Sequence, residues 1–304
     1  FGLEYTPDEV LIASGAKPLL YEALQMLVDP GDEVLLFSPA WVSYVEQIHL
    51  AGGKDVIVDT LKTDLIPTKE ALEAVLSEKT VGMIVNSPSN PSGAIYNEET
   101  LKMIADIARE RDLWIIFDEI YERLVYGPAK HVNILNVAPD LRDKVILING
   151  ASKAYAMTGW RIGYALGPKP LIAKMNTLQT HLTSNASSIA QWAAWGAVKD
   201  ADPDVEKMRE AFEERRGVIL GLVRDMPYVK VRDPEGAFYI FIDVRESPIP
   251  DDMKFCEKLL EEKFVAAVPG TAFFAPGFIR FSYACSMENI REGMGRLKEF
   301  LQAL

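Results

Sequence analysis

The stretch NGASKAYAMTGWRIGY (residues 149–164) connects two apolar runs, residues 145–148 and 161–166, that each have the composition of a buried strand. Lys153 leaves the end of the first run, and Arg161 begins the second. A lysine amine forms Schiff bases with carbonyl compounds, and an arginine can hold an anion beside it. An exposed loop lysine and a salt-bridged arginine would produce the same local pattern, so the rest of the chain must decide.

Composition excludes several classes of protein. The 304 residues are 49% hydrophobic and 25% charged, which is typical of a globular protein of about two domains. A net charge of -12 argues against a nucleic-acid partner, and no apolar run reaches the roughly 18 residues of a membrane span. Cys256 and Cys285 lack metal-ligand spacing, and the three histidines are scattered. We expect a cytoplasmic protein that binds no metal, does not associate with a membrane and has no leader peptide.

The order of apolar runs predicts an α/β fold. Helical segments separate seven predicted strands, so we expect a mostly parallel seven-stranded sheet with helices on both faces. The strands are expected at residues 9–15, 33–37, 55–60, 81–85, 113–117, 145–148 and 161–166. After a polar break near residue 200 the pattern changes to a smaller α+β unit. We therefore predict a large domain over residues 1–205 and a small one over residues 206–304.

Polar groups follow several of these strands. Asn90 lies in the rigid loop at residues 86–93, and Asp118 and Tyr121 follow the fifth strand. Ligands of open α/β sheets bind at the carboxyl ends of the strands. A capped turn would explain the carboxylate and the phenol equally well. These residues therefore indicate a ligand site only when they are considered together with the other candidates.

The first strand runs into a glycine and the start of a helix. Free N–H groups at Gly15, Ala16 and Lys17 would form an anion site there, although an ordinary strand-to-helix turn has the same pattern. Trp41 begins another helix, where it either joins the core or offers a flat face to a ring. Taken together, a lysine, a carboxylate, neighbouring donors and an anion site meet the requirements of pyridoxal phosphate.

The sequence resembles the class I aminotransferases of the fold-type-I pyridoxal-phosphate superfamily over essentially its whole length. The likeness is closest to the bacterial aspartate-aminotransferase subgroup. The motifs that carry it are SPAWVSY (38–44), NSPSNPSG (86–93), DEIYE (118–122), NGASKAYAMTGWRIGY (149–164) and RFSYACS (280–286).

This resemblance implies roles for the residues that would surround the cofactor ring. Lys153 would bond to pyridoxal phosphate and, once displaced by substrate, would move the substrate α-proton. Asp118 would hold the ring nitrogen, while Asn90 and Tyr121 would donate to the 3′ oxygen. Trp41 would stack on the ring. Lys153, Asp118 and Tyr121 are therefore the expected catalytic residues.

The resemblance also implies how anionic groups are held. Gly15, Ala16 and Lys17 match a phosphate-binding turn, and Arg161 matches an arginine that pairs with the phosphate. Arg280 would grip the substrate α-carboxylate as a fork, a geometry that lysine fills poorly. Lys17 either reads the distal carboxylate of an acidic substrate or only adds positive charge near the phosphate.

The implied reaction is amino transfer by a ping-pong mechanism in amino-acid biosynthesis, preferably from aspartate to 2-oxoglutarate. The substrate is expected to contact Arg280, Asn90, Trp41 and Lys17. Aromatic, prephenate-type or broad specificity is the next alternative. A β-lyase on the same fold and a non-catalytic ligand sensor remain as rivals, because fold does not fix the reaction.

The resemblance further implies a homodimer whose active sites are shared between subunits. The apolar stretch at residues 187–198 suits either a subunit interface or the core. The family pattern begins upstream of Phe1, with an arm that carries substrate- and phosphate-contacting residues. We expect this arm to be missing from these 304 residues rather than from the protein.

Two positions depart from the family pattern. Gly150 stands where many relatives carry a phosphate-binding serine, so Ser152 or backbone amides would have to substitute for it. Ala40 stands where relatives often have an aromatic residue, which would loosen the substrate side.

Overall fold

A seven-stranded sheet, built mostly from parallel strands, forms the larger part of the protein. The computed structural model describes residues 1–304. In sheet order the strands are β1 (Val10–Ala13), β7 (Gly163–Leu166), β6 (Val145–Gly150), β5 (Trp114–Asp118), β4 (Thr80–Asn86), β2 (Glu33–Phe37) and β3 (Lys54–Val58). The strands from β3 to β6 pair in parallel, while β7 is antiparallel to both β6 and β1. The predicted α/β class and strand number are confirmed.

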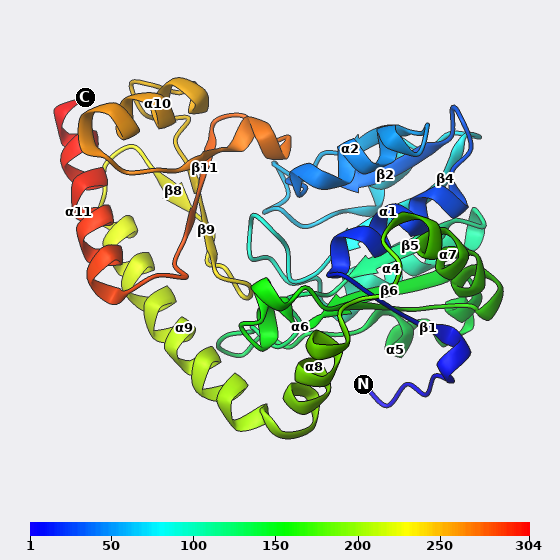
Figure 1. Cartoon of the computed structure of the whole chain (residues 1–304). Helices are drawn as coiled ribbons and strands as arrows, with labels where there is room; N and C mark the ends of the chain where they lie inside the picture. Colours follow the sequence, from blue (N-terminus) through cyan, green and yellow to red (C-terminus); the bar gives the residue numbers. More distant parts are fainter.

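Alternation along the central strands supplies two apolar faces, because successive side chains of a strand point to opposite sides. Ile84, Ile116 and Ile146 belong to one core with α1, α2 and α7. Met83 and Ile115 belong to the other core with α4 and α5. Figure 1 shows these helices covering the sheet from both sides. The helices of this part are α1 (Ala16–Leu27), α2 (Val42–Leu50), α3 (Lys69–Glu73), α4 (Glu98–Glu110), α5 (Ile134–Val137), α6 (Ala151–Ala154), α7 (Lys169–Leu182) and α8 (Ser188–Asp200).

A second, four-stranded antiparallel sheet lies beside the first (Figure 1). Its strands, in sheet order, are β10 (Val268–Pro269), β11 (Phe278–Ser282), β9 (Tyr239–Asp243) and β8 (Lys230–Val231). Its helices are α9 (Asp202–Arg224), α10 (Asp252–Lys263) and α11 (Met287–Ala303). This is the smaller α+β part that the sequence predicted. Helix α9 runs unbroken through residues 205 and 206, so the predicted boundary falls inside a helix, and the division into domains stays a prediction.

Helix α8 contains the apolar stretch for which the sequence left two alternatives, the core or a subunit interface. Only Ala190 and Ala194 of this helix are buried, whereas Ile189, Trp192 and Trp195 are more than half exposed. Only the alanines of the apolar stretch at residues 187–198 therefore pack into a core cluster, and its large side chains lie outside it. Small residues occupy the narrow buried side, and the large side chains project away from the protein. No helix of the chain is long and apolar enough to cross a membrane.

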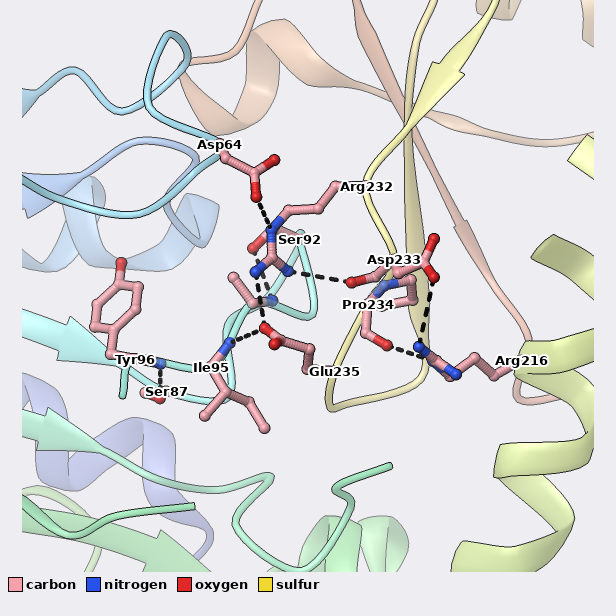
Figure 2. A network of polar contacts seen from close by, with 11 residues as sticks. Asp64, Ser87, Ser92, Ile95, Tyr96, Arg216, Arg232, Asp233, Pro234 and Glu235 are labelled. Carbon is pink, nitrogen blue, oxygen red and sulfur yellow. Dashed lines mark hydrogen bonds and ion pairs between the residues drawn. The ribbon is translucent and has the colours of Figure 1, made fainter. Parts of the chain in front are cut away.

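A polar network ties the loop at residues 232–236, before β9, to the large sheet (Figure 2). Arg232 Nε donates to Asp64 Oδ2 at 3.0 Å, and a terminal nitrogen of Arg232 donates to Glu235 Oε2 at 2.8 Å. The Ile95 amide donates to the same Glu235 oxygen at 3.4 Å. The Glu235 amide in turn donates to the Gly93 carbonyl at 2.8 Å. The network thus anchors the loop that follows β4 to the smaller sheet.

Replacing Arg232 with alanine is expected to reduce the free energy of unfolding by about 1–2 kcal/mol, because the Glu235 carboxylate loses its charged donor. The Arg232 side chain is only 16% exposed, whereas the Asp64 side chain is 75% exposed. Asp64→Asn is the matched control and is expected to change stability by less than about 0.5 kcal/mol. Urea unfolding of both variants provides the test, and equal losses would contradict this account of the network.

Candidate active site

A cavity of about 280 Å³ opens where the carboxyl ends of the parallel strands face the smaller sheet. It collects nearly all the residues that the sequence singled out, from segments far apart in the chain. Its walls include Ala16, Lys17, Trp41, Asn90, Asp118, Tyr121, Lys153, Arg161 and Arg280. Gly15 adjoins Ala16 and lies against the Arg161 guanidinium. No group of three or more potential metal-ligating side chains is present anywhere in the structure.

Asp118 lies at the end of β5 as a buried carboxylate with two hydrogen bonds. Tyr44 Oη donates to Asp118 Oδ2 at 2.6 Å, and the Ile120 amide donates to Oδ1 at 3.2 Å. Burial raises the pKa of Asp118 to about 6, although both hydrogen bonds and Lys153 act in the opposite direction. A cation in the cavity would stabilise the ionised form of this carboxylate.

Tyr44 is a site residue that the sequence did not single out. It is buried on α2, three residues after Trp41, and the two rings pack edge to face with centroids 5.3 Å apart. Residues three apart share one face of a helix, so this spacing was the available signal. The signal was weak because a buried tyrosine is ordinary core material.

The DEIYE turn presents its side chains to two different surroundings. Asp118 and Tyr121 line the cavity. The buried Glu119 carboxylate instead accepts from Asn133 Nδ2 at 3.0 and 3.1 Å and contacts His131 Nε2 at 2.8 Å. These contacts anchor the turn that carries the two cavity residues.

Lys153 follows β6 on the short helix α6 and makes no ion pair. Its Nζ atom lies 5.8 Å from the centroid of the Tyr121 ring and 5.5 Å from that of Phe238. Burial lowers the pKa of Lys153, and the positive charges of Arg161 and Arg280 lower it further, against the attraction of Asp118. A lowered pKa favours the neutral amine, which is the form that acts as a nucleophile or a base.

A backbone turn and an arginine form one end of the cavity. Gly15 caps α1 with φ +94°, and a Cβ atom there would lie 2.2 Å from Arg161 Nη2, so this position requires glycine. Arg161 donates to the Thr158 carbonyl at 3.0 Å and to the Ser14 carbonyl at 3.3 Å. The guanidinium is thereby held at the start of α1, where the free amides of Ala16 and Lys17 favour an anion. The Gly15 amide, which the sequence predicted to be free, instead donates to the Ala13 carbonyl at 2.8 Å.

The departure at Gly150 has a steric reason. A Cβ atom at Gly150 would lie 2.7 Å from the Ile162 carbonyl oxygen and 2.9 Å from the Gly163 Cα atom. A serine therefore does not fit without a shift of the strand pair. Ser152 and Thr158 both line the cavity, and the Thr158 hydroxyl donates to the Ser152 carbonyl at 3.0 Å. The Ser152 hydroxyl is therefore the one without a protein partner.

Arg280 reaches the cavity from β11 of the smaller sheet. It donates to Asn90 Oδ1 at 2.8 Å, which joins the two sheets. Its guanidinium carbon lies 4.4 Å from the centroid of the Tyr239 ring and 4.9 Å from that of Phe273. The Nε atom is buried without a hydrogen-bond partner, and burial lowers the pKa of the guanidinium. An unpaired buried donor of this kind suits a carboxylate ligand.

Lys17 also lines the cavity, and its Nζ atom lies 4.8 Å from the centroid of the Trp41 ring. Lys17, Lys153, Arg161 and Arg280 therefore give the cavity four basic side chains, and Asp118 is its single carboxylate. A ligand with several anionic groups and one basic nitrogen would match this distribution of charge.

The family profile described as aminotransferase class I and II matches residues 1–297. The chain therefore belongs to the class I and II aminotransferases. It is 44% identical to an aspartate aminotransferase of Geobacillus stearothermophilus, covering 99% of this chain and 78% of that protein. It is 42% identical to an aspartate/prephenate aminotransferase of Thermus thermophilus, covering 99% and 77%. The structure of a Thermus thermophilus aspartate aminotransferase with maleate aligns with a TM-score of 0.93 at 41% identity, covering 99% and 78%.

Proposed function

We propose that the cavity binds pyridoxal 5′-phosphate and that the protein transfers the amino group of aspartate to a 2-oxo acid such as 2-oxoglutarate by a ping-pong mechanism. The observation that carries this proposal is the arrangement of three groups around one cavity. An amine with a lowered pKa, a buried carboxylate and an anion cradle surround it from different segments of the chain. These are the groups that pyridoxal phosphate requires.

The residues present fit that cofactor. Asp118 would hold the ring nitrogen, since an opposite charge there favours its ionised form. Tyr121 and Asn90 would donate to the ring oxygen, and Trp41 would stack on the ring. The phosphate would be held by the backbone N–H groups of Ala16 and Lys17, by Ser152 and by Arg161, with Gly15 leaving room for the guanidinium.

When bound, pyridoxal phosphate supplies a carbonyl carbon for the amino group and a ring that withdraws electrons from the substrate Cα. Lys153 Nζ would take the proton from that Cα, a role for which its lowered pKa suits it. Arg280 would bind the α-carboxylate and so fix the Cα–H bond relative to the amine. The walls formed by Trp41 and Tyr239 would limit access of water.

The choice of an acidic substrate rests on Lys17 together with the relatives. Lys17 lies over Trp41 and lines the same cavity as Arg280, so it could pair with a second carboxylate of the substrate. The Geobacillus relative is named an aspartate aminotransferase, and the Thermus structure contains maleate, a dicarboxylate. The Thermus aspartate/prephenate relative supports prephenate as the second candidate substrate.

An amino-donor screen of the purified protein tests this function. The protein should be yellow, and aspartate should convert its absorbance to that of the aminated cofactor with release of a keto acid. Lys17→Gln should raise the KM for aspartate about tenfold or more and leave that for alanine nearly unchanged, as expected for loss of one charged pair. Release of ammonia and pyruvate would instead identify a lyase, and absence of any reaction with bound cofactor would favour a sensor.

A homodimer is part of the proposal. Helix α8 exposes Ile189, Trp192, Trp195 and Val198, whose exposed fractions lie between 56% and 74%. A contiguous apolar surface of this size on one helix is unusual for a monomer. The helix begins beside Trp160 and Arg161, so a second copy seated on it would lie next to the anion cradle. A cytoplasmic location is also proposed, supported by the two unpaired cysteines.

Replacing Trp192 with glutamate is expected to shift the protein from dimer to monomer, because a charge would enter the centre of the apolar surface. The matched control is Leu50→Glu, which changes a residue on α2 that is 69% exposed, similar to the 70% of Trp192. Sedimentation velocity of both variants provides the measurement. A dimer that persists in the Trp192 variant, or dissociates equally in the control, would contradict the assignment of this face.

A further inference from the structure

Two phenols meet in the wall of the cavity at the junction of the two sheets. Tyr239 Oη on β9 lies 3.0 Å from Tyr121 Oη, and the rings are perpendicular with centroids 5.9 Å apart. Both side chains are buried, and both line the cavity. This hydrogen bond is the only one that either hydroxyl makes within the protein.

The number of protons in this pair of phenols restricts which hydroxyl can donate the hydrogen bond. A phenol has one proton to donate and two lone pairs that accept. If Tyr121 donated to Tyr239, no proton of Tyr121 would remain for a ligand in the cavity. If Tyr239 donates, the Tyr121 proton is free to point into the cavity, and the donated bond polarises Tyr121 so that it becomes a better donor.

Tyr239 has a second contact, made by its ring rather than its hydroxyl. The Arg280 guanidinium carbon lies 4.4 Å from the centroid of that ring. A cation over an aromatic face is attracted by the ring quadrupole, and phenylalanine retains most of that attraction. One side chain therefore contacts both the phenol on the large sheet and the arginine on the small sheet, through two different parts.

We propose that Tyr239 is a positioning residue with two separable parts. Its hydroxyl donates to Tyr121, so that Tyr121 can donate to the ring oxygen of the cofactor, and its ring supports Arg280 for binding of the substrate α-carboxylate. The inference rests on the proposed function, because it assigns Tyr121 a bound cofactor to act upon. Tyr239 thereby couples the cofactor side of the cavity to its substrate side.

The charged surroundings are consistent with a protonated donor. Burial raises the pKa of Tyr121 well above its usual value, and Tyr239 and Asp118 raise it further, while Arg280 lowers it. Lys153 lies 5.8 Å from the Tyr121 ring, and Tyr44 approaches from α2 through its bond to Asp118. Tyr121 therefore keeps its proton over the range in which the enzyme would work.

The experiment compares Tyr239→Phe, Tyr239→Leu, Tyr121→Phe and the double variant Tyr121→Phe/Tyr239→Phe as holoenzymes. The measurement is the pH midpoint of the cofactor absorbance. Tyr121→Phe removes the donor to the ring oxygen and should raise the midpoint. Tyr239→Phe should raise the pH midpoint by about 10–30% of the shift seen in Tyr121→Phe. It removes only the cooperative polarisation of Tyr121 by the bond that Tyr239 donates. The double variant should match Tyr121→Phe, since without Tyr121 the Tyr239 hydroxyl has no partner through which to act.

The contact between the Tyr239 ring and Arg280 is tested separately, by the KM for aspartate. Tyr239→Phe should keep the KM for aspartate within about twofold of wild type, whereas Tyr239→Leu should raise it about tenfold through loss of the cation–aromatic contact. Unfolding midpoints of the apo-proteins identify any variant whose fold is damaged, and Tyr239→Phe preserves the shape of the ring. An unchanged absorbance midpoint in Tyr239→Phe, or additive shifts in the double variant, would overturn the inference and leave the proposed function intact. A wild-type protein without cofactor absorbance would overturn both.

Discussion

Lys153→Ala is expected to abolish amino transfer, lowering kcat by at least about 10⁴-fold, because it removes the covalent attachment and the base together. Lys153→Arg should fail as well, since a guanidinium keeps its proton at working pH. The fold should remain intact. Burial lowers the pKa of Lys153, so the protonated amine is a cost to the folded state that alanine removes. The measurements are single-turnover amino transfer and thermal unfolding.

The matched control for this prediction is Lys54→Ala. Lys54 forms a surface ion pair with Glu33 at 3.4 Å and lies on β3, at the edge of the sheet. Its replacement should leave activity near that of wild type. Borohydride reduction supplies a second measurement, because it should fix the cofactor to Lys153 in the wild type and to no residue in the alanine variant. A labelled peptide that lacks Lys153 would refute the assignment.

Asp118→Asn is expected to have the second-largest effect. Removing one partner of a buried ion pair costs about 3–5 kcal/mol, which corresponds to roughly 10²–10⁴-fold in cofactor affinity or in kcat. Asparagine retains the approximate shape and can still accept from Tyr44 or Ile120, so the loss would report charge rather than packing. Affinity of the apo-protein for pyridoxal phosphate is the most direct measurement. An affinity within threefold of wild type would refute the role of Asp118 at the ring nitrogen.

The same substitution is expected to stabilise the apo-protein. Burial raises the pKa of Asp118 to about 6 in the folded state, above its usual value of about 3.9. Between these values the folded protein binds more protons than the unfolded chain, so stability falls as pH rises from about 4 to 6. Asp118→Asn removes this cost and should increase the free energy of unfolding at pH 8 by roughly 3 kcal/mol, with no gain at pH 4.

Asp140→Asn is a control for which the expected change in the free energy of unfolding at pH 8 has the opposite sign. Arg109 lowers the pKa of this surface carboxylate through hydrogen bonds at 2.7 and 3.0 Å, so its replacement should lose stability at pH 8. Urea unfolding of the apo-proteins at both pH values tests the pair. If Asp118→Asn were less stable than wild type at pH 8, the proposed conflict between stability and cofactor binding at this carboxylate would be wrong.

Much of the fold could be predicted from local pattern alone. The runs at residues 33–37 and 145–148 are apolar and bounded by turns, and both form strands of the central sheet. Strand residues alternate between the two cores, so parallel strands covered on both faces follow from the residues themselves. The apolar spacing at residues 67–77 predicts a helix over that whole range, whereas α3 covers only Lys69–Glu73 and hydrogen bonds of Ser77 form a turn before β4.

The sequence by itself determined which residues stand at the ends of strands, and hence the lysine, carboxylate and arginine that line the cavity and the glycine beside them. Those positions depend on neighbours within a few residues. Only the tertiary structure decided that Tyr44 bonds Asp118, that Tyr239 bonds Tyr121, and that α8 turns its tryptophans outward. These contacts join residues 74 and 118 positions apart in the first two cases. No periodicity of a single helix or strand encodes such a separation, because the first contact is set by how α2 packs on the large sheet and the second by how the two sheets meet.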